Sequence, residues 1–309
     1  MSGLSHSRRA FNDLAQGSEK AVVRVDAPLG VSLDPLAAYG ALTEDADYGF
    51  LLESAEKTAA SDPEGAFEPA HASGDRHARY SFIGYDPDAV LTLGPDGDSV
   101  RMCRHTDDPA AIPAGADALQ ARIAGEGAQR DPGDVLDRLR GGLPDVERRG
   151  FPDTDRQLLD GGLVGFIAYD AVYDLWLEEV GVERPDSPVP DAEFVLTTRT
   201  VVFDHRDGSV DLVFTPVVGP DDDPDAVYDA LVDEADRVRR LLQSATSPEL
   251  APISLESRSS GSRETYEAAV RRAKQAIHDG EVYQAVLSRV REMEGTVDPM
   301  ALYAALREA

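Results

Sequence analysis

The sequence predicts an α+β fold, made largely of antiparallel sheets with packed helices. Short runs of β-forming residues recur through residues 20–214. Asp207 and Gly208 stand between two apolar runs, a pattern typical of a hairpin and therefore of antiparallel pairing. Segments with apolar residues at helical spacing are fewer. Together these features describe helices packed on antiparallel sheet.

The expected strands are short apolar runs bounded by turn residues. They cover residues 20–26, 49–54, 79–84, 88–93, 162–169, 194–203 and 210–214. Turn-rich acidic or polar stretches lie between several of them and are expected to be loops or insertions. These stretches are 61–76, 104–115 and 124–133.

The expected helices follow from apolar spacing and from capping residues. The clearest begins at Pro224 and places apolar residues at helical spacing on one face. Shorter helices are expected at 34–43, where Asp34 can cap the first turn, and at 134–140. The long helix is expected to lie on the sheet.

The chain is expected to divide at a segment rich in Ser, Pro and Gly. Residues 1–244 form a strand-rich first region, residues 245–261 a linker without helical or strand period, and residues 262–309 the start of a second region. The sequence contains no internal repeat.

The second region begins with an amphipathic helix that is expected to end near Gly280. A strand at 282–290 is expected next, with the polar Gln284 on its otherwise apolar face. A last helix, capped by Asp298, reaches the end of the sequence with no following element to cover it. We therefore expect the chain to be a fragment.

The charge balance is strongly acidic. The chain has 58 acidic and 30 basic residues, a formal net charge of −28, and the lysines are Lys20, Lys57 and Lys274. Such a surface repels phosphates, so we expect no binding of nucleic acid or of an anionic membrane. Abundant carboxylates with scarce lysine predict adaptation to concentrated salt, which screens self-repulsion. An acidic surface made for a specific partner is the alternative.

Further classes are excluded by what the sequence lacks. It has no apolar run of about 18 residues and its start has no signal-peptide core, so a cytoplasmic location is expected. The single cysteine, Cys103, excludes an internal disulfide. No Walker loop, GxGxxG, HExxH or GxSxG motif is present, and the six histidines are scattered. General motifs therefore define no chemistry.

Five segments of the sequence are distinctive: FLLESAE (50–56), RYSFIGYDP (79–87), GGLVGFIAYDAVYDLW (161–176), PDAEFVLTTRTVVFDH (190–205) and ETYEAAVRRAKQAIHDGEVYQAVLSR (264–289). They resemble, in the family's own order, segments of the chorismate-using enzymes of the anthranilate synthase large-subunit family. With the salt adaptation, the chain resembles a haloarchaeal member truncated at its C-terminus. The resemblance implies an incomplete chorismate-utilising fold whose first region is regulatory.

The same resemblance implies a reaction for the complete protein, which would be a lyase of tryptophan biosynthesis. It would convert chorismate and ammonia into anthranilate and pyruvate, with Mg²⁺ as cofactor, a glutamine amidotransferase small subunit as ammonia source and tryptophan as feedback inhibitor. The family's Mg²⁺ ligands and most of its chorismate contacts follow the point where this sequence stops. No metal ligand is therefore assigned in this chain, and we expect the chain alone to be inactive.

Two residues are expected to bind the feedback inhibitor. In the family the LLES string lies at the tryptophan-binding strand, which transfers ligand roles to Glu53 and Ser54. A carboxylate and a hydroxyl at a strand end can hydrogen-bond the charged ends of an amino acid. The alternative is that Glu53 is a surface residue and Ser54 turns the chain.

Gln284 indicates the branch of the family. Related isochorismate and salicylate synthases carry a water-activating lysine at the matching position, and a neutral amide cannot act as that base. Gln284 can only orient a reactant, which agrees with ammonia as the nucleophile. Its alternative role is to satisfy a neighbour inside the sheet. The rival functions are the folate-branch aminodeoxychorismate synthase and a non-catalytic tryptophan-binding or subunit-docking fragment.

Overall fold

The computed structural model describes residues 3–17, 20–53, 79–103, 133–143, 146–153, 158–248 and 250–308. Backbone contacts separate the chain into two compact units, Met1–Pro248 and Glu249–Ala309. The predicted α+β class is confirmed, because helices pack on sheets whose neighbouring strands are antiparallel in all but one pair of the described residues.

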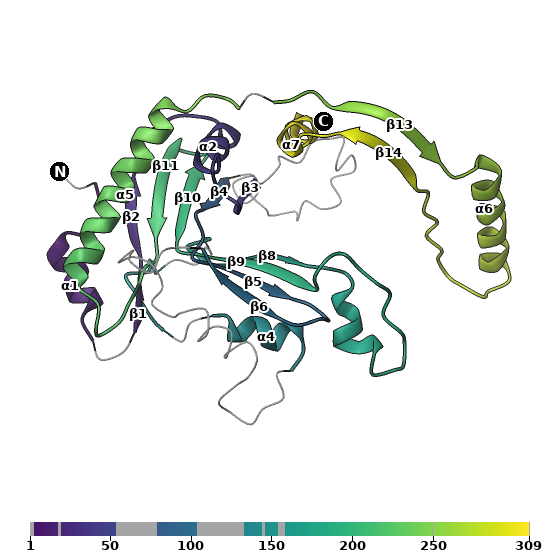
Figure 1. The fold of residues 1–309 in the computed structure, drawn as a ribbon, viewed down its shortest axis with the longest axis horizontal. Helices are drawn as coiled ribbons and strands as arrows, with labels where there is room; N and C mark the ends of the chain where they lie inside the picture. Colours follow the sequence, from purple (N-terminus) through teal and green to yellow (C-terminus); the bar gives the residue numbers. More distant parts are fainter. Residues whose placement is uncertain are drawn as a thin grey trace. The chain divides into compact units, whose positions relative to one another are not determined.

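Among the described residues, the first unit contains three sheets, and Figure 1 labels the strands of the two larger ones. The five-stranded sheet has the order β2 (Val25–Pro28), β11 (Ser209–Phe214), β10 (Arg199–Asp204), β4 (Tyr80–Tyr85), β3 (Gly49–Glu53). The four-stranded sheet has the order β6 (Ser99–Met102), β5 (Ala89–Leu93), β9 (Ala192–Thr197), β8 (Gly162–Ile167). The small sheet has the order β12 (Val217–Val218), β1 (Ala21–Val23), β7 (Glu147–Arg149), and β1–β7 is the parallel pair. The predicted hairpin is confirmed as β10–β11.

The two larger sheets are joined by two segments of the chain, each of which passes from one sheet directly into the other. β4 leads into β5, and β9 leads into β10. The prediction of a single strand at 194–203 is therefore wrong, because this segment belongs to two strands in different sheets. At the break the Thr198 hydroxyl donates to Asp88 Oδ2 at 2.6 Å, and both side chains are buried. The β-forming run TTRT continues through the break, so composition did not mark it.

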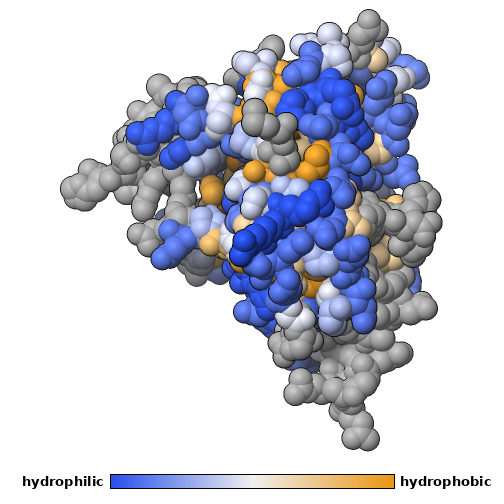
Figure 2. Space-filling view, turned by 90° about the vertical axis from the view of Figure 1, so that its left-hand side faces the viewer, coloured by the Kyte–Doolittle hydropathy of each residue, from blue (hydrophilic) through white to orange (hydrophobic). Residues whose placement is uncertain are grey.

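The core of the five-stranded sheet lies under the helix α5 (Pro224–Ser244). Helices α1 (Arg8–Ala15) and α2 (Pro35–Leu42) pack beside it. The apolar face of α5 buries Val227, Leu231 and Val238 against strand residues such as Phe214. Burying each such side chain contributes about 1.5–3 kcal/mol. Figure 2 shows that the outside of the molecule is mostly hydrophilic on the face it presents.

Capping agrees with the sequence where the cap is local. The Leu36 amide donates to Asp34 Oδ1 at 2.8 Å, which confirms the predicted start of α2.

The four-stranded sheet has its own core, in which α4 (Val135–Gly141) places Val135 and Leu139 beside Leu91 and Leu196. Helix α1 was not predicted, because its eight residues carry too short an apolar pattern.

The second unit contains β13 (Ser254–Ser260), α6 (Arg263–His278), β14 (Arg291–Thr296) and α7 (Pro299–Glu308). The two helices confirm the prediction, since Gly280 has a positive φ of 76° just after α6 and the Met300 amide donates to Asp298 Oδ1 at 2.9 Å. β13 and β14 pair in antiparallel fashion.

The strand predicted at residues 282–290 is wrong, because these residues have no regular structure. The segment 245–261, predicted to be a linker, contains β13, and the boundary between the two units, after residue 248, lies within it. A strand forms only where a partner strand is available. β14 pairs with β13, whose polar sequence SLESRSS has no apolar alternation that would predict a strand.

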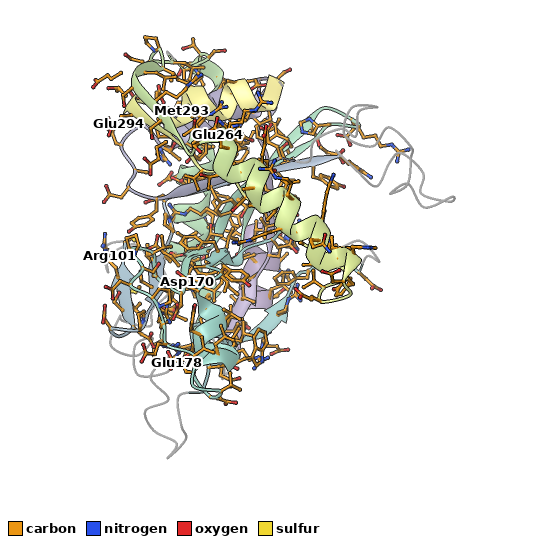
Figure 3. The ribbon with its side chains drawn as sticks, turned by 90° about the vertical axis from the view of Figure 1, so that its right-hand side faces the viewer. Arg101, Asp170, Glu178, Glu264, Met293 and Glu294 are labelled. Carbon is orange, nitrogen blue, oxygen red and sulfur yellow. The ribbon has the colours of Figure 1, made fainter. Side chains whose placement is uncertain are left out.

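Side chains in the second unit are largely open to solvent. Every residue of β13 and β14 is exposed, and α6 buries none of its residues. Figure 3 shows Met293 and Glu294 next to each other on β14 and Glu264 on α6. In the described part of the chain, no helix is long and apolar enough to cross a membrane.

Candidate functional site

Glu53 is the last residue of β3, at the edge of the five-stranded sheet. Its side chain is half-buried, and its register partner on β4 is Ser81. Directly opposed residues of antiparallel strands place their side chains on the same face of the sheet. Glu53 and Ser81 therefore lie side by side on the face that α5 covers with Ile83 and Tyr85. Ser54 lies outside the described residues.

Ser81 is buried, with 1% of its surface exposed, and it bonds to a histidine from another strand end. Its Oγ lies 2.7 Å from Nε2 of His205, the residue that follows β10. The imidazole is exposed and stacks beside Phe203. Which of the two atoms donates depends on the tautomer of His205. The hydroxyl thus connects a buried strand to a group that solvent can reach.

An ion pair holds this end of the sheet together. Arg79 Nε donates to Asp204 Oδ1 at 2.9 Å and Oδ2 at 3.0 Å. The hydrogen bond from Arg79 holds the pKa of the Asp204 carboxyl below its usual value, against the opposing effect of burial. The His205 amide donates to the Arg79 carbonyl at 2.8 Å. The backbone that carries His205 is thereby tied to β4.

The strand register and the Ser81–His205 contact place a carboxylate, a hydroxyl and an imidazole at one end of one sheet face. The carboxylate of Glu53 can accept hydrogen bonds from an ammonium group, and the hydroxyl of Ser81 can both donate and accept. Sequence analysis found Glu53 but missed Ser81 and His205. Both residues lie in segments that resemble the family, yet their contact joins residues 124 positions apart.

A second polar cluster fixes α5 to the same sheet. The Tyr85 hydroxyl donates to Glu234 Oε1 at 2.8 Å, and Arg237 Nε donates to Oε2 at 2.7 Å. Arg199 Nη1 lies 3.5 Å from Glu234 Oε1 and 3.2 Å from Asp86 Oδ2. Burial raises the pKa of the Tyr85 hydroxyl well above its usual value. This hydroxyl therefore stays protonated and donating.

Gln284 is placed differently from the prediction. It lies in the irregular segment between α6 and β14, and its side chain is exposed. It is not on a strand, and both readings of its role stay predictions for the complete protein. Gln284 and Glu53 belong to different units.

The described residues provide no metal centre. Among them, no group of three or more His, Cys, Asp or Glu side chains is arranged to hold an ion. Several of their carboxylates are instead paired with arginine, as in the Arg138 contacts to Asp98 and Asp174. The described residues therefore do not fit a Mg²⁺ site.

Comparison with known proteins resolves the family. The sequence profile described as chorismate binding enzyme matches residues 103–309. The chain belongs to the chorismate-binding enzyme family. The matched region includes Gln284 and His205, whereas Glu53 and Ser81 precede it.

Two relatives of this chain carry a common name. Anthranilate synthase component 1 of Haloferax volcanii is 54% identical over 309 residues, which are 100% of this chain and 56% of the relative. Anthranilate synthase component 1 1 of Halobacterium salinarum is 55% identical over 306 residues, 98% of this chain and 55% of the relative. The chain thus spans about half the length of these curated relatives.

A solved structure is also similar to this chain. Anthranilate synthase component I from Streptococcus pneumoniae matches with a TM-score of 0.45 and 21% identity, over 81% of this chain and 49% of that one.

Proposed function

We propose that the complete protein is the large subunit of anthranilate synthase. It converts chorismate and ammonia into anthranilate and pyruvate, as a cytoplasmic lyase of tryptophan biosynthesis. The observation that carries this proposal is the identity of 54% and 55%, over nearly the whole chain, to two relatives named anthranilate synthase component 1. The names of these two relatives favour this enzyme over the folate-branch alternative, aminodeoxychorismate synthase.

The role of the first unit is regulation by tryptophan. Glu53 and Ser54 bind the amino acid, and Glu53 accepts hydrogen bonds from its ammonium group. The support is the position of Glu53 at a strand end, half-buried and beside a hydroxyl. A carboxylate in that setting faces fewer competing water molecules than one in open solvent.

Gln284 supports ammonia as the nucleophile. A glutamine amide donates and accepts hydrogen bonds but cannot remove a proton from water at neutral pH. In the complete protein it orients the reacting groups. Mg²⁺, if held by residues other than those described, would supply positive charge beside the substrate. A glutamine amidotransferase small subunit supplies the ammonia, in keeping with relatives named as component 1 of their enzyme.

The surface is adapted to concentrated salt. The support is a net charge of −28 with three lysines, together with relatives from Haloferax volcanii and Halobacterium salinarum. Repulsion among so many carboxylates destabilises the compact state until counter-ions screen it.

The proposal is tested with two proteins in the same buffer of high salt, chorismate, ammonium and Mg²⁺. Anthranilate fluorescence is expected for the complete protein, with inhibition by tryptophan, and no turnover is expected for the 309-residue chain. Chorismate consumption by the 309-residue chain would show that the active site lies within it. A folded complete protein that leaves chorismate unchanged would refute the proposed activity.

A further inference from the structure

We infer that the open edge of β8 is the docking site for a further β-strand, supplied by the part of the complete protein that lies outside this chain. The occupant is an apolar strand of about six residues, long enough to pair along the whole of β8. The inference goes beyond the proposed reaction. It takes from that proposal only a complete protein as long as its relatives.

The open edge follows from the position of β8 in its sheet. β8 is the last strand of the four-stranded sheet, so within the described residues β9 is its only partner strand (Figure 1). Along an antiparallel pair, residues whose backbone groups face the partner alternate with residues whose groups face away. The Ala168 amide donates to the Asp191 carbonyl at 2.8 Å, one position beyond the end of β8. The backbone groups of Leu163, Gly165 and Ile167 therefore face away from β9.

The sequence of β8 does not block further pairing. Edge strands are usually protected by a charge, a proline or a short length. β8, with the sequence GLVGFI, has neither a charge nor a proline along its six residues. Each of the other edge strands of the two larger sheets has such a residue: Asp26 and Pro28 in β2, Glu53 in β3 and Arg101 in β6. The edge of β8 is thus the one of these four that is left fit for a partner strand.

Apolar side chains at this edge are open to solvent. Phe166 and Ile167 are both 45% exposed, and successive residues of a strand point to opposite faces of the sheet. The stretch 161–169 contains no charge, in a chain in which 28% of the residues are charged. A surface that stays in contact with concentrated salt would be expected to carry carboxylates here as elsewhere. The two exposed side chains instead suit apolar cross-strand neighbours on both faces of an added strand.

A strand of the same polypeptide fits this edge better than a second copy of the chain. The chain spans 56% of the Haloferax volcanii relative and 55% of the Halobacterium salinarum relative, so nearly half of each lies outside the match. A covalently joined strand reaches the edge at high effective concentration. Two copies would have to bring together two net charges of −28. A strand also satisfies the outward backbone groups together, which a helix packed on the edge cannot do.

Amide hydrogen exchange tests the inference, measured at single-residue resolution in high salt and corrected for intrinsic rates. In the 309-residue chain, the outward amides of Leu163, Gly165 and Ile167 are expected to exchange about a hundredfold faster than those of Val164 and Phe166, which face β9. In the complete protein, all five amides are expected to exchange slowly, because the added strand accepts hydrogen bonds from the outward ones.

Two proline variants form a matched pair, because they replace adjacent apolar residues of equal exposure. Phe166→Pro removes an amide that faces β9, and Ile167→Pro removes one that faces outward. In the 309-residue chain, Phe166→Pro is expected to lower the melting temperature by more than about 5 °C, and Ile167→Pro to change it by less than about 2 °C. In the complete protein, Ile167→Pro is expected to lower the melting temperature by more than about 3 °C.

Rapid exchange of the outward amides in the complete protein overturns the inference, and so does a complete protein that Ile167→Pro leaves as stable as wild type. Slow exchange of these amides in the 309-residue chain also overturns it. If that protection rises with protein concentration, a second copy occupies the edge, and if it does not, the chain covers the edge itself.

The anthranilate assay of the complete protein is read separately. Protected outward amides in a complete protein without activity would refute the proposed reaction and support this inference. If a proline variant does not fold, exchange in the two wild-type proteins decides the question.

Discussion

Replacing Glu234 by alanine will destabilise the first unit strongly, because it removes the carboxylate on which a buried cluster converges. Glu234 accepts hydrogen bonds from the Tyr85 hydroxyl at 2.8 Å and from Arg237 at 2.7 and 2.9 Å. Arg199, 7% exposed, lies 3.5 Å from the same carboxylate. The substitution leaves a buried hydroxyl and a buried guanidinium without their shared partner.

The expected loss of stability depends on which partners of Glu234 are buried. Removing one member of a buried ion pair costs about 3–5 kcal/mol. Arg199 keeps its contact with Asp86, and the ion pair of the exposed Arg237 contributes little to stability. We therefore expect the free energy of unfolding to fall by about 3 kcal/mol. Glu234→Gln keeps an acceptor for Tyr85 and should cost about 1–2 kcal/mol. Asp236→Ala, on the exposed side of the same helix, should cost less than about 1 kcal/mol.

The pH dependence gives the same prediction a second test. Burial acts to raise the pKa of Glu234, but the hydrogen bond from Arg237 and the charge of Arg199 outweigh it and hold the pKa below its usual value. The resulting stabilisation is complete above the unfolded glutamate pKa of about 4.3 and is lost as the pH falls through the folded pKa. The difference in stability between wild type and Glu234→Gln should therefore narrow only below about pH 4.3.

Urea unfolding of the 309-residue chain, followed by circular dichroism in high salt, measures these differences. Equal slopes with urea would show that the midpoints report stability. A Glu234→Ala variant within about 1 kcal/mol of wild type would refute the role of the carboxylate in holding α5 to the sheet.

Three further predictions concern the core and the surface. Leu231→Ala, in the buried face of α5, should cost about 2–5 kcal/mol in urea unfolding, and a loss below about 1 kcal/mol would contradict the packing of α5. Thr200→Val should raise stability by about 1 kcal/mol, because Thr200 Oγ1 is buried without a hydrogen-bond partner in the described structure; a clear loss would reveal a missing partner. The melting temperature of the wild type should rise steeply between about 0.1 and 2 M KCl, whereas the cost of Glu234→Ala should change little, because salt screens exposed charges far more than buried ones. A melting temperature that is independent of salt would exclude the proposed surface adaptation.

The sequence predicted those elements whose determinants are local. The apolar face of α5, the Asp34 cap of α2 and the Asp207-Gly208 turn each act within a few residues, and the structure confirms all three. The break between β9 and β10 depends on the contact of Thr198 with Asp88, 110 positions away, and was missed. The strand predicted at 282–290 was wrong for a related reason, since pairing is decided by the partner strand.

The candidate site also contains residues that the sequence could predict and residues that it could not. Glu53 was found because it stands in a string that resembles the family, not because its own chemistry is distinctive. His205 stood in another such string and was read as one of several scattered histidines. The contact with Ser81 exists only once β10 pairs with β4, so no spacing along the sequence could have predicted it. Gln284 is the opposite case. Its alternating sequence pattern predicted a strand, but the residue is exposed and lies in an irregular segment.

The central claim concerns the reaction of the complete protein, and its product is the most direct test. The protein is incubated in high salt with chorismate, ammonium and Mg²⁺, and the products are separated and identified by mass. We predict anthranilate and pyruvate in equal amounts, and less of both when tryptophan is added. Aminodeoxychorismate without pyruvate, or isochorismate, would contradict the assignment.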